Sequence, residues 1–317
     1  MNDADAWQPG ASMAVLRQRA ALFASIRQFF ASRKVLEVDT PLLSGCFGSD
    51  PCIEPIVASI NGAVGYLQSS PEFFLKRLLA AGSGDIYSLG RAFRNEESGR
   101  RHNPEFTLLE WYRCGWDEYQ LMDEVEELVT VLLDAAPAKR VTYAELFENA
   151  VGLNPHTASL EQLYHCARQC GEWVACARAA TLDLLFAERV EPILPAGLVF
   201  VCDFPSSHSA LAQIQRRPGG ETVARRFELY CDGIELANGY LELTDASEQQ
   251  YRFNQELEQR RSSQLPIAPL DRALLAALDH GMPDCAGVAL GVDRLLMAQL
   301  GVGDIDSVQP FSWPRCR

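Results

Sequence analysis

One stretch, residues 91–113, limits what this chain can fold into more than any other. It reads RAFRNEESGRRHNPEFTLLEWYR and alternates basic, acidic and aromatic side chains, with too many charges for a buried core strand. Asn103-Pro104 lies in its middle and does not continue a helix, because the residue before a proline disfavours the helical region. The stretch therefore predicts two short strands joined by a charged loop.

The loop of this predicted hairpin contains groups that can bind a nucleotide. Arg94 could hold a phosphate through two donors and stabilise the charge that develops when the phosphate is displaced. Glu96 could accept a hydrogen bond from an exocyclic amine, and Phe106 has a flat face for stacking on a base. The alternative is an exposed hairpin with surface ion pairs, which is what most charge-rich runs are.

A second segment, GIELANGYLE at 233–242, contains two carboxylates seven residues apart. On a simple strand Glu235 and Glu242 would point to opposite faces, because side chains alternate. The Asn-Gly between them could turn or bulge the chain and bring both into one cleft. One carboxylate could then hold Mg²⁺ on the phosphates and the other a substrate ammonium. An exposed hairpin with incidental acids is the alternative.

Two further segments have features of a binding site. GVALGVDR at 287–294 predicts a strand that runs into a helix, where small residues let the backbone lie close to a flat ligand. Arg294 opens that helix, near the end that favours phosphate; the alternative is a tightly packed turn with Arg294 paired to an acid.

Glu72 opens a helix at 71–81. It is either an acid that the helix dipole stabilises at this end or an anchor for an ammonium group.

Composition restricts the partners and the compartment. With 28 basic and 42 acidic residues, the net charge is −14, which does not favour extensive binding of tRNA. No run of about 18 apolar residues predicts a membrane helix, and the acidic N-terminus does not fit a signal peptide. Ten cysteines without a Cys-x-x-Cys pair predict reduced thiols in the cytoplasm. His165, Cys166 and Cys170 are close enough to suggest a metal, but a zinc site needs about four ligands.

Hydrophobic periodicity predicts an α+β fold. The expected helices are at 13–33, 71–81, 117–135, 247–261 and 270–280, and the expected strands at 35–39, 86–89, 107–113, 198–204 and 223–244. Strands joined mainly by hairpins favour an antiparallel sheet flanked by helices. Residues 136–195 lack a sharp chemical motif and predict a mainly helical insertion in a single domain over 1–317.

The charged segments occur in the order found in the catalytic domain of class II lysyl-tRNA synthetases and resemble its motifs. Motif 1 is similar to the helix at 13–33 followed by VLEVDTPLL, motif 2 to residues 91–113, and motif 3 to GVALGVDRLLM. The resemblance covers nearly the whole chain outside the insertion. It implies a six- or seven-stranded antiparallel sheet flanked by helices, in a homodimer formed through motif 1.

The resemblance also implies roles for individual residues. Arg94 and Arg294 would be catalytic, on the α- and γ-phosphates of ATP. The implied ATP contacts are Arg94, Asn95, Glu96, His102, Asn103, Phe106, Glu235, Leu236, Gly291 and Arg294, with Glu235 and Glu242 as ligands of Mg²⁺. The implied contacts to the amino acid are Ser70, Pro71, Glu72, Glu110, Tyr112, Asn238, Glu242 and Ala289. Carboxylates near a buried ammonium make physical sense, and such a site would reject uncharged analogues.

Some positions depart from the synthetase pattern. Motif 1 begins near residue 13, so we expect this chain to lack the N-terminal anticodon-binding domain of those enzymes. Ala289 stands where they usually have glycine, and Thr244 where they usually have asparagine. These features resemble the elongation factor P–(R)-β-lysine ligases, which are truncated paralogues of lysyl-tRNA synthetase.

This second resemblance implies a function. The chain is expected to activate (R)-β-lysine, or lysine, with ATP and Mg²⁺ as an acyl-adenylate and to transfer it to a lysine of elongation factor P. One alternative is a minimal lysyl-tRNA synthetase that charges tRNA. The other is a catalytically inactive paralogue that senses an amino acid.

Overall fold

The computed structural model describes residues 7–171 and 177–316. Cys176 and the first six residues, which entered the expectations on thiols and on a signal peptide, lie outside this part. The chain divides into two compact units, which we describe separately. Unit 1 consists of Met1–Trp116, Val131–Leu133 and Thr244–Arg317, and unit 2 of Asp117–Thr130 and Asp134–Leu243. No helix in the described residues is long and apolar enough to cross a membrane.

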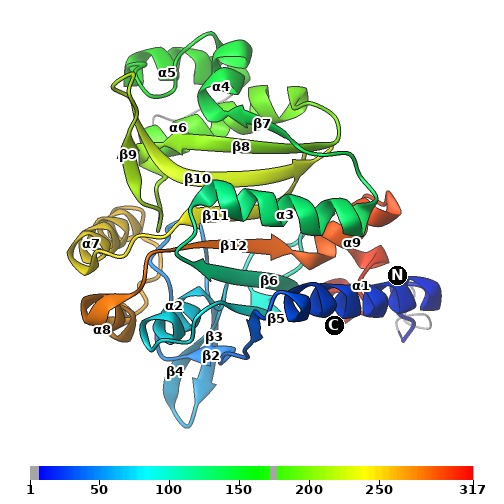
Figure 1. Ribbon diagram of the computed structural model, residues 1–317. Helices are drawn as coiled ribbons and strands as arrows, with labels where there is room; N and C mark the ends of the chain where they lie inside the picture. The colour runs from blue at the N-terminus through cyan, green and yellow to red at the C-terminus, as the bar shows by residue number, and fades with distance from the viewer. Residues whose placement is uncertain (1–6, 172–176, 317) are drawn as a thin grey trace. The chain divides into compact units, whose positions relative to one another are not determined.

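Unit 1 is built around four strands in the order β1-β5-β6-β12 (Figure 1). β1 is parallel to β5, whereas β5, β6 and β12 are antiparallel neighbours. Its elements are α1 (Met13–Ser32), β1 (Leu36–Glu37), β2 (Leu43–Ser44), β3 (Ile56–Ile60), β4 (Ala63–Leu67), α2 (Glu72–Ala80), β5 (Ile86–Phe93), β6 (Glu105–Cys114), α7 (Ala246–Ser262), α8 (Arg272–Gly281), β12 (Cys285–Gly291), α9 (Val292–Leu300) and short helical turns at Ile305–Ser307 and Trp313–Arg315.

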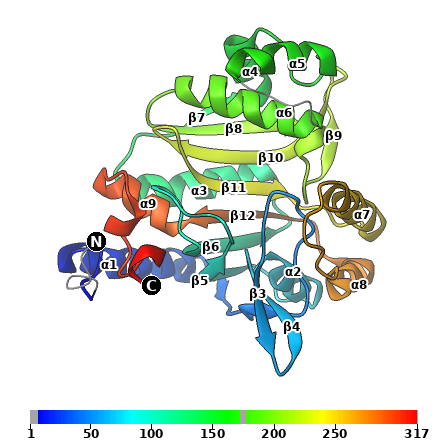
Figure 2. The same ribbon diagram turned by 180° about the vertical axis from the view of Figure 1, so that it is seen from behind.

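The apolar face of α1 forms part of the core of unit 1. Ser12 caps the helix, and Leu22, Ile26 and Phe30 are buried at helical spacing. Phe30 stacks on Tyr87 of β5 with ring centroids 4.5 Å apart and meets Trp111 of β6 edge-on at 5.3 Å. In the small sheet β2-β4-β3, the hairpin formed by β3 and β4 projects from unit 1 in both ribbon views (Figure 2).

Unit 2 contains the strands β11, β10, β8 and β7 in that order, with β9 on β10. Here β7 is parallel to β8, and the other pairs are antiparallel. Its elements are α3 (Glu118–Leu133, whose last residues belong to unit 1), β7 (Lys139–Thr142), α4 (Tyr143–Val151), α5 (Leu160–Ala167), α6 (Arg178–Leu185), β8 (Leu198–Pro205), β9 (Ile214–Arg216), β10 (Thr222–Cys231), β11 (Ile234–Leu241) and short helical segments at Arg168–Cys170, Phe186–Val190, Glu191–Ile193 and Ser206–His208.

The helices of segment 136–195 share a hydrophobic core with one face of these strands. Tyr143 of α4 and Phe186 stack at 4.7 Å, and both belong to a buried cluster with Val199, Val201 and Tyr230. Since Val199 and Val201 pair with Tyr230 and Glu228 in register, the helices cover the face of β10 that carries Glu228 and Tyr230.

The α+β class and the predicted helices are confirmed, and two details of the sheet are corrected. Within residues 7–171 and 177–316 the large sheet has nine strands instead of six or seven, and its pairs β1/β5 and β7/β8 are parallel, so the sheet is mixed. The hairpin turn in 223–244 lies at Asp232-Gly233, where both residues have positive φ, 47° and 74°. Asn238-Gly239 lies within β11 and makes no turn.

Candidate active site

Arg94 follows β5 at the start of the predicted phosphate loop. Its backbone N–H donates to the Pro104 carbonyl at 3.0 Å, which closes the loop. The guanidinium lies over the ring of Phe106, 5.2 Å from its centroid, and its ion pair with Glu97 is 3.3 Å long. Within residues 7–171 and 177–316, its buried Nε has no hydrogen-bond partner. The side chain is therefore held in place while donors remain available for an anion.

The backbone of the loop is held by another segment of unit 1 at Asn95 and adopts an uncommon conformation at Glu96. Asn95 N–H donates to the carbonyl of Glu54 at 2.9 Å, and Glu96 adopts a left-handed conformation with φ of 63°. A non-glycine residue in this region is uncommon and costs energy, so the surrounding contacts must fix it.

His102 and Arg294 meet, although 192 residues separate them in the sequence. The Arg294 guanidinium donates to Nε2 of His102 at 2.6 Å. Desolvation lowers the pKa of His102, and the charge of Arg294 lowers it further. The imidazole is therefore neutral and accepts this hydrogen bond, which places Arg294 of α9 beside the loop of Arg94.

Asn103, a predicted ATP contact, has a structural role in this geometry. Its side chain is buried; Nδ2 donates to the Glu105 carbonyl at 2.7 Å, and Oδ1 accepts from Trp313 N–H at 2.8 Å. Both ends of the carboxamide thus bind the main chain, and a contact to ATP stays a prediction.

A buried carboxylate, Glu110, lies on β6 and receives two hydroxyl donors. Ser70 Oγ donates to one oxygen at 2.9 Å and Tyr112 Oη to the other at 2.8 Å. Ser70 Oγ also accepts from the N–H of Glu72, the first residue of α2 after the buried Pro71. The structure thus joins the predicted residues Ser70, Glu72, Glu110 and Tyr112 into one group.

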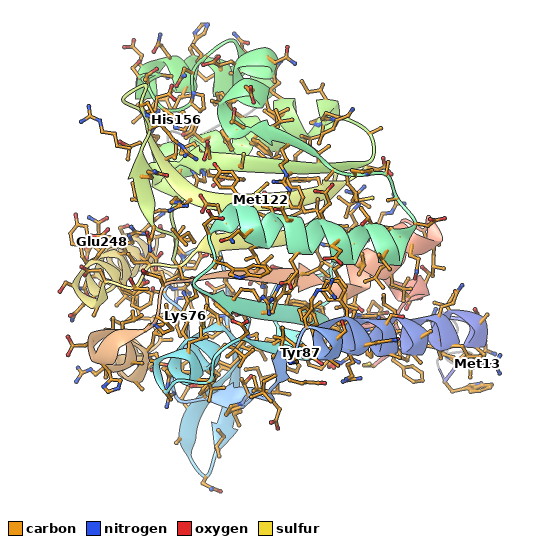
Figure 3. All side chains as sticks on the ribbon, in the orientation of Figure 1. Met13, Lys76, Tyr87, Met122, His156 and Glu248 are labelled. Atoms are coloured by element: carbon orange, nitrogen blue, oxygen red, sulfur yellow. The ribbon has the colours of Figure 1, made fainter. Side chains whose placement is uncertain are left out.

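Lys76, which the sequence analysis did not single out, binds Glu72. Its Nζ lies 2.7 Å from Glu72 Oε1, and its side chain is 1% exposed (Figure 3, on α2). A lysine one helical turn after an acid normally forms a weak surface pair. Here the buried ammonium holds one carboxylate oxygen of Glu72.

Ala289 lies opposite Glu110 in the register of β6 and β12, and Gly287 lies opposite Tyr112. Residues paired across antiparallel strands share a face, with Cβ atoms about 5 Å apart. The methyl group of Ala289 therefore borders the carboxylate of Glu110. Gly291 lies two residues further along the same face, at the start of α9.

In unit 2 a bulge in β11 brings the predicted acids to one face. Leu229 pairs with Ala237 and Tyr230 with Glu235, which leaves the buried Leu236 as the extra residue. Glu235 thereby joins the face of Asn238 and Glu242. Along the strand Glu235 and Glu242 remain about 20 Å apart, so a single ion does not bind both.

Three residues of β10, which the sequence analysis passed over, share that face. Arg226 pairs in register with Tyr240, Glu228 with Asn238 and Tyr230 with Glu235. The signal for them was present as a period of two, Arg-x-Glu-x-Tyr, in an otherwise apolar strand.

Comparisons with known proteins agree with these motifs. Residues 6–315 match the family described as tRNA synthetases class II (D, K and N). The chain belongs to this family. It is 49% identical to the elongation factor P–(R)-β-lysine ligase of Pseudoalteromonas translucida, over 98% of both chains. It is 46% identical to the proteins of the same name from Pectobacterium carotovorum, over 99% of this chain and 100% of that protein, and from Vibrio parahaemolyticus, over 97% and 98%.

The carboxylates of this family member fit a magnesium ion held mainly by a nucleotide. Among the residues that the structure describes, no group of three or more His, Cys, Asp and Glu side chains could hold a metal. Magnesium is usually bound through one or two carboxylates together with substrate phosphates, so a magnesium site of this kind does not require such a group. Structural zinc needs a closed set of about four ligands, and His165, Cys166 and Cys170 do not form one.

A buried ion pair joins the three family motifs in unit 1. Asp293, beside Arg294, binds Arg19 of α1 at 2.6 Å and accepts from the N–H of Thr107 on β6 at 2.6 Å. Arg19 also donates to the Thr107 hydroxyl at 2.7 Å and to the Val308 carbonyl at 3.3 Å. Both charged side chains are less than a tenth exposed.

We expect Asp293→Ala to lower the free energy of unfolding by about 3–5 kcal/mol, because it leaves the buried Arg19 without its carboxylate. Thermal or urea unfolding measures the change. Asp304→Ala is the control, because that exposed acid caps only a short helical turn. Equal stability of the two variants would contradict this role of Asp293.

Proposed function

We propose that this ligase activates (R)-β-lysine with ATP as an acyl-adenylate and transfers it to the ε-amine of a lysine on elongation factor P. The observation that carries the proposal is the position of Glu110. This buried carboxylate lies on the hairpin that presents Arg94 and lies opposite Ala289. The names of the relatives agree with this pair of substrates.

In the first step, a carboxylate oxygen of β-lysine attacks the α-phosphorus of ATP. The bond from that phosphorus to the bridging oxygen breaks, and pyrophosphate leaves with the electron pair. Arg94 neutralises charge on the α-phosphate and Arg294 charge on the γ-phosphate. Phe106 stacks on adenine and Glu96 accepts from its amine.

In this proposal, side chains from each unit bind the amino acid for this attack. Glu110 and Glu242 bind the terminal ammonium, with Tyr112 and Asn238 completing its hydrogen bonds. Glu72 binds the amine nearer the carboxylate. A buried ammonium requires such partners, and an analogue without it would leave buried carboxylates unpaired.

In the second step, the ε-amine of the acceptor lysine attacks the acyl-adenylate carbonyl. A carbon–nitrogen bond forms, the carbon–oxygen bond to AMP breaks, and one proton passes from the amine to solvent. The amine attacks in its neutral form, so we expect its pKa to be depressed in the complex.

Magnesium bound with ATP would neutralise part of the phosphate charge. We assign Glu235 as its protein ligand and Glu242 to the amino acid, because the strand separates these two residues.

The decisive experiment combines the purified chain with ATP, Mg²⁺, one lysine isomer and elongation factor P. We expect elongation factor P to gain the mass of one lysyl group, with (R)-β-lysine preferred, and AMP to be released. Charging of tRNA in its place would support the minimal synthetase. Absence of AMP release with every substrate would support the inactive sensor.

We expect Ala289→Gly to relax the discrimination between (R)-β-lysine and α-lysine by about tenfold, because one methyl group in a packed pocket accounts for roughly that factor. Separate kcat/KM values for the two isomers measure it. Ala286→Gly is the matched control, since it removes a methyl group from the same strand at the position paired with Arg113. An unchanged preference in Ala289→Gly would mean that this residue does not set specificity.

We also propose a homodimer formed through motif 1, in a single cytoplasmic catalytic domain over 1–317 with an insertion at 136–195. Several apolar side chains around motif 1 and the hairpin after it are exposed, which supports such an interface. They are Leu36, Leu42, Leu43, Val57 and Val64. Light scattering after gel filtration tests the dimer, and a monomer at micromolar concentration would contradict it.

A further inference from the structure

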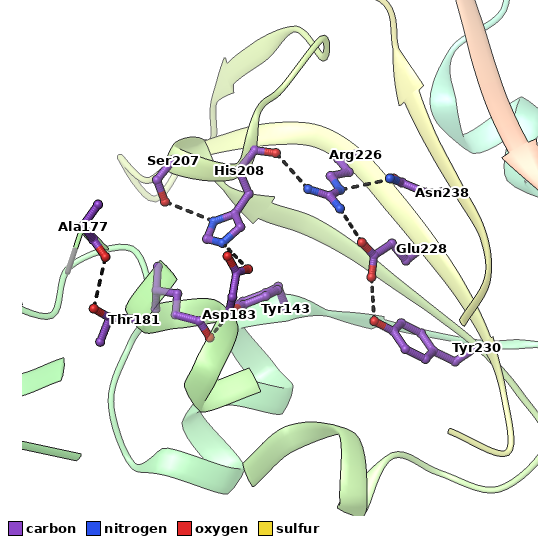
Figure 4. A network of polar contacts seen from close by, with 11 residues as sticks. Tyr143, Ala177, Thr181, Asp183, Ser207, His208, Arg226, Glu228, Tyr230 and Asn238 are labelled. Atoms are coloured by element: carbon purple, nitrogen blue, oxygen red, sulfur yellow. Dashed lines mark hydrogen bonds and ion pairs between the residues drawn. The ribbon is translucent and has the colours of Figure 1, made fainter. Parts of the chain in front are cut away.

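The guanidinium of Arg226 is bound on every nitrogen within unit 2. Nε donates to Asn238 Oδ1 at 3.2 Å, Nη1 to the His208 carbonyl at 3.2 Å, and Nη2 to Glu228 Oε1 (Figure 4). The group lies over the ring of Phe204, 4.6 Å from its centroid. A guanidinium spreads its donors over three nitrogens in one plane, so it reaches three separate acceptors at once.

Arg226 decides which way the carboxamide of Asn238 points. Nδ2 of Asn238 donates to Tyr240 Oη at 2.9 Å. If the amide of Asn238 flipped, this hydroxyl could donate to the amide oxygen instead, so Tyr240 is compatible with either orientation of the amide. Arg226 has only donors and therefore requires the oxygen on its side. The amide oxygen has a second lone pair, which can accept a hydrogen bond from an ammonium group. The NH₂ group is only a donor and cannot bind an ammonium.

Glu228 balances the charge of Arg226. Its other oxygen accepts from Tyr230 Oη at 2.6 Å, and the residue is buried opposite Asn238 in register. Burial raises the pKa of Tyr230, and the charges of Glu228 and Glu235 raise it further, so the hydroxyl stays protonated and donates. An unpaired Arg226 would repel an ammonium at Asn238, and Glu228 removes that repulsion.

Segment 136–195 supports this arrangement through His208. The ring Nε2 of His208 lies 2.8 Å from Asp183 Oδ1 on α6, and Nδ1 lies 3.1 Å from Ser207 Oγ. The carbonyl of the same residue accepts from Arg226. Figure 4 shows Asp183 and Tyr143 of this segment beside the ring of His208. Asp183 of α6 is therefore linked to Arg226 through His208, and Arg226 in turn binds Asn238.

We propose that Arg226 is a positioning residue for the amino acid, which holds Asn238 with its carbonyl oxygen available to the terminal ammonium. Segment 136–195 fixes Arg226 through Asp183 and His208. The inference rests on the proposed function, which assigns Asn238 to that ammonium.

The test is Arg226→Lys in amino-acid-dependent exchange between ATP and pyrophosphate, with KM measured separately for (R)-β-lysine and ATP. Lysine retains the charge that Glu228 needs, but its donors sit on a single nitrogen, which does not reach the three acceptors that Nε, Nη1 and Nη2 of Arg226 contact. We expect KM for the amino acid to rise about tenfold, as for the loss of a strong hydrogen bond, with KM for ATP within about twofold. Unchanged values, or an equal rise in both, would overturn the proposal.

A double-mutant cycle separates positioning from general support. If Arg226 acts through Asn238, Arg226→Lys should add little to the KM of Asn238→Ala, and fully additive effects would overturn the proposal.

Asp183→Ala tests the link to the insertion without disturbing the core, because this side chain is 60% exposed. We expect a rise of about threefold in KM for the amino acid alone, as for loss of a weak interaction; no change would refute the link. Absence of exchange in the unaltered chain would contradict the proposed function itself.

Discussion

Replacing Arg94 by alanine should reduce adenylate formation about 1000-fold, the largest loss that we expect from any single side chain here. The change removes the guanidinium that meets the α-phosphate as its charge grows, which corresponds to about 4 kcal/mol of transition-state stabilisation. Exchange of pyrophosphate into ATP measures this step without the acceptor protein. The fold should be preserved, because a partly exposed ion pair such as Arg94–Glu97 stabilises a protein by at most about 1 kcal/mol.

Arg91→Ala is the matched control for this prediction. Arg91 lies three residues earlier and has a similar ion pair, with Glu105 at 3.3 Å, on a side chain that is 39% exposed. It lacks the contact with Phe106 and should retain nearly full exchange activity. Arg94→Lys should be intermediate, because it keeps a charge but loses the two-pronged geometry. Near-normal exchange in Arg94→Ala would exclude the assignment of this residue to the α-phosphate.

The segments that were predictable from sequence are those whose pattern is local. Helix α1 repeats Leu22, Ile26 and Phe30 on one face, and α3 begins with a capping box formed by Asp117 and Gln120. β7 and β9 have four and three residues, most of them exposed, so no alternation marks them as strands. Their pairing, and the parallel direction of β7, depend on partners far away in the chain.

In the candidate site, too, the residues with a local signal were predictable and those that depend on distant partners were not. Arg94, Glu110 and Arg294 were recognisable because charged residues interrupt strands and a helix start, where a core would not place them. Arg19, the partner of Asp293, was not recognisable from the sequence. It lies in an amphipathic helix, where an arginine normally faces water, and 274 residues separate it from Asp293. Arg226 and Glu228 alternate along β10, but which face they occupy depends on the bulge at Leu236 and on the helices that cover it.

Replacing Glu110 by glutamine should raise KM for (R)-β-lysine about 100-fold and leave KM for ATP nearly unchanged. Glutamine has the same shape, and its oxygen can still accept one of the two hydroxyl donors, from Ser70 or Tyr112. What it lacks is the negative charge that a buried ammonium requires. A hydrogen bond between charged groups contributes about 3 kcal/mol, and that energy corresponds to a factor of about 100.

Tyr87→Phe is the control for Glu110→Gln. It removes a hydrogen bond of similar length, 2.7 Å from Tyr87 Oη to Glu37, from the strand next to β6 (Figure 3). Tyr87 pairs with Trp111, so it lies on the other face of the sheet from Glu110. This variant should lose about 1 kcal/mol of stability with unchanged KM values, because only a structural hydrogen bond is removed.

A tenfold or larger rise in KM for ATP in Glu110→Gln would show that the carboxylate binds the nucleotide and not the amino acid. An unchanged KM for the amino acid would show that the ammonium is bound elsewhere, and would remove the observation on which the proposed function depends.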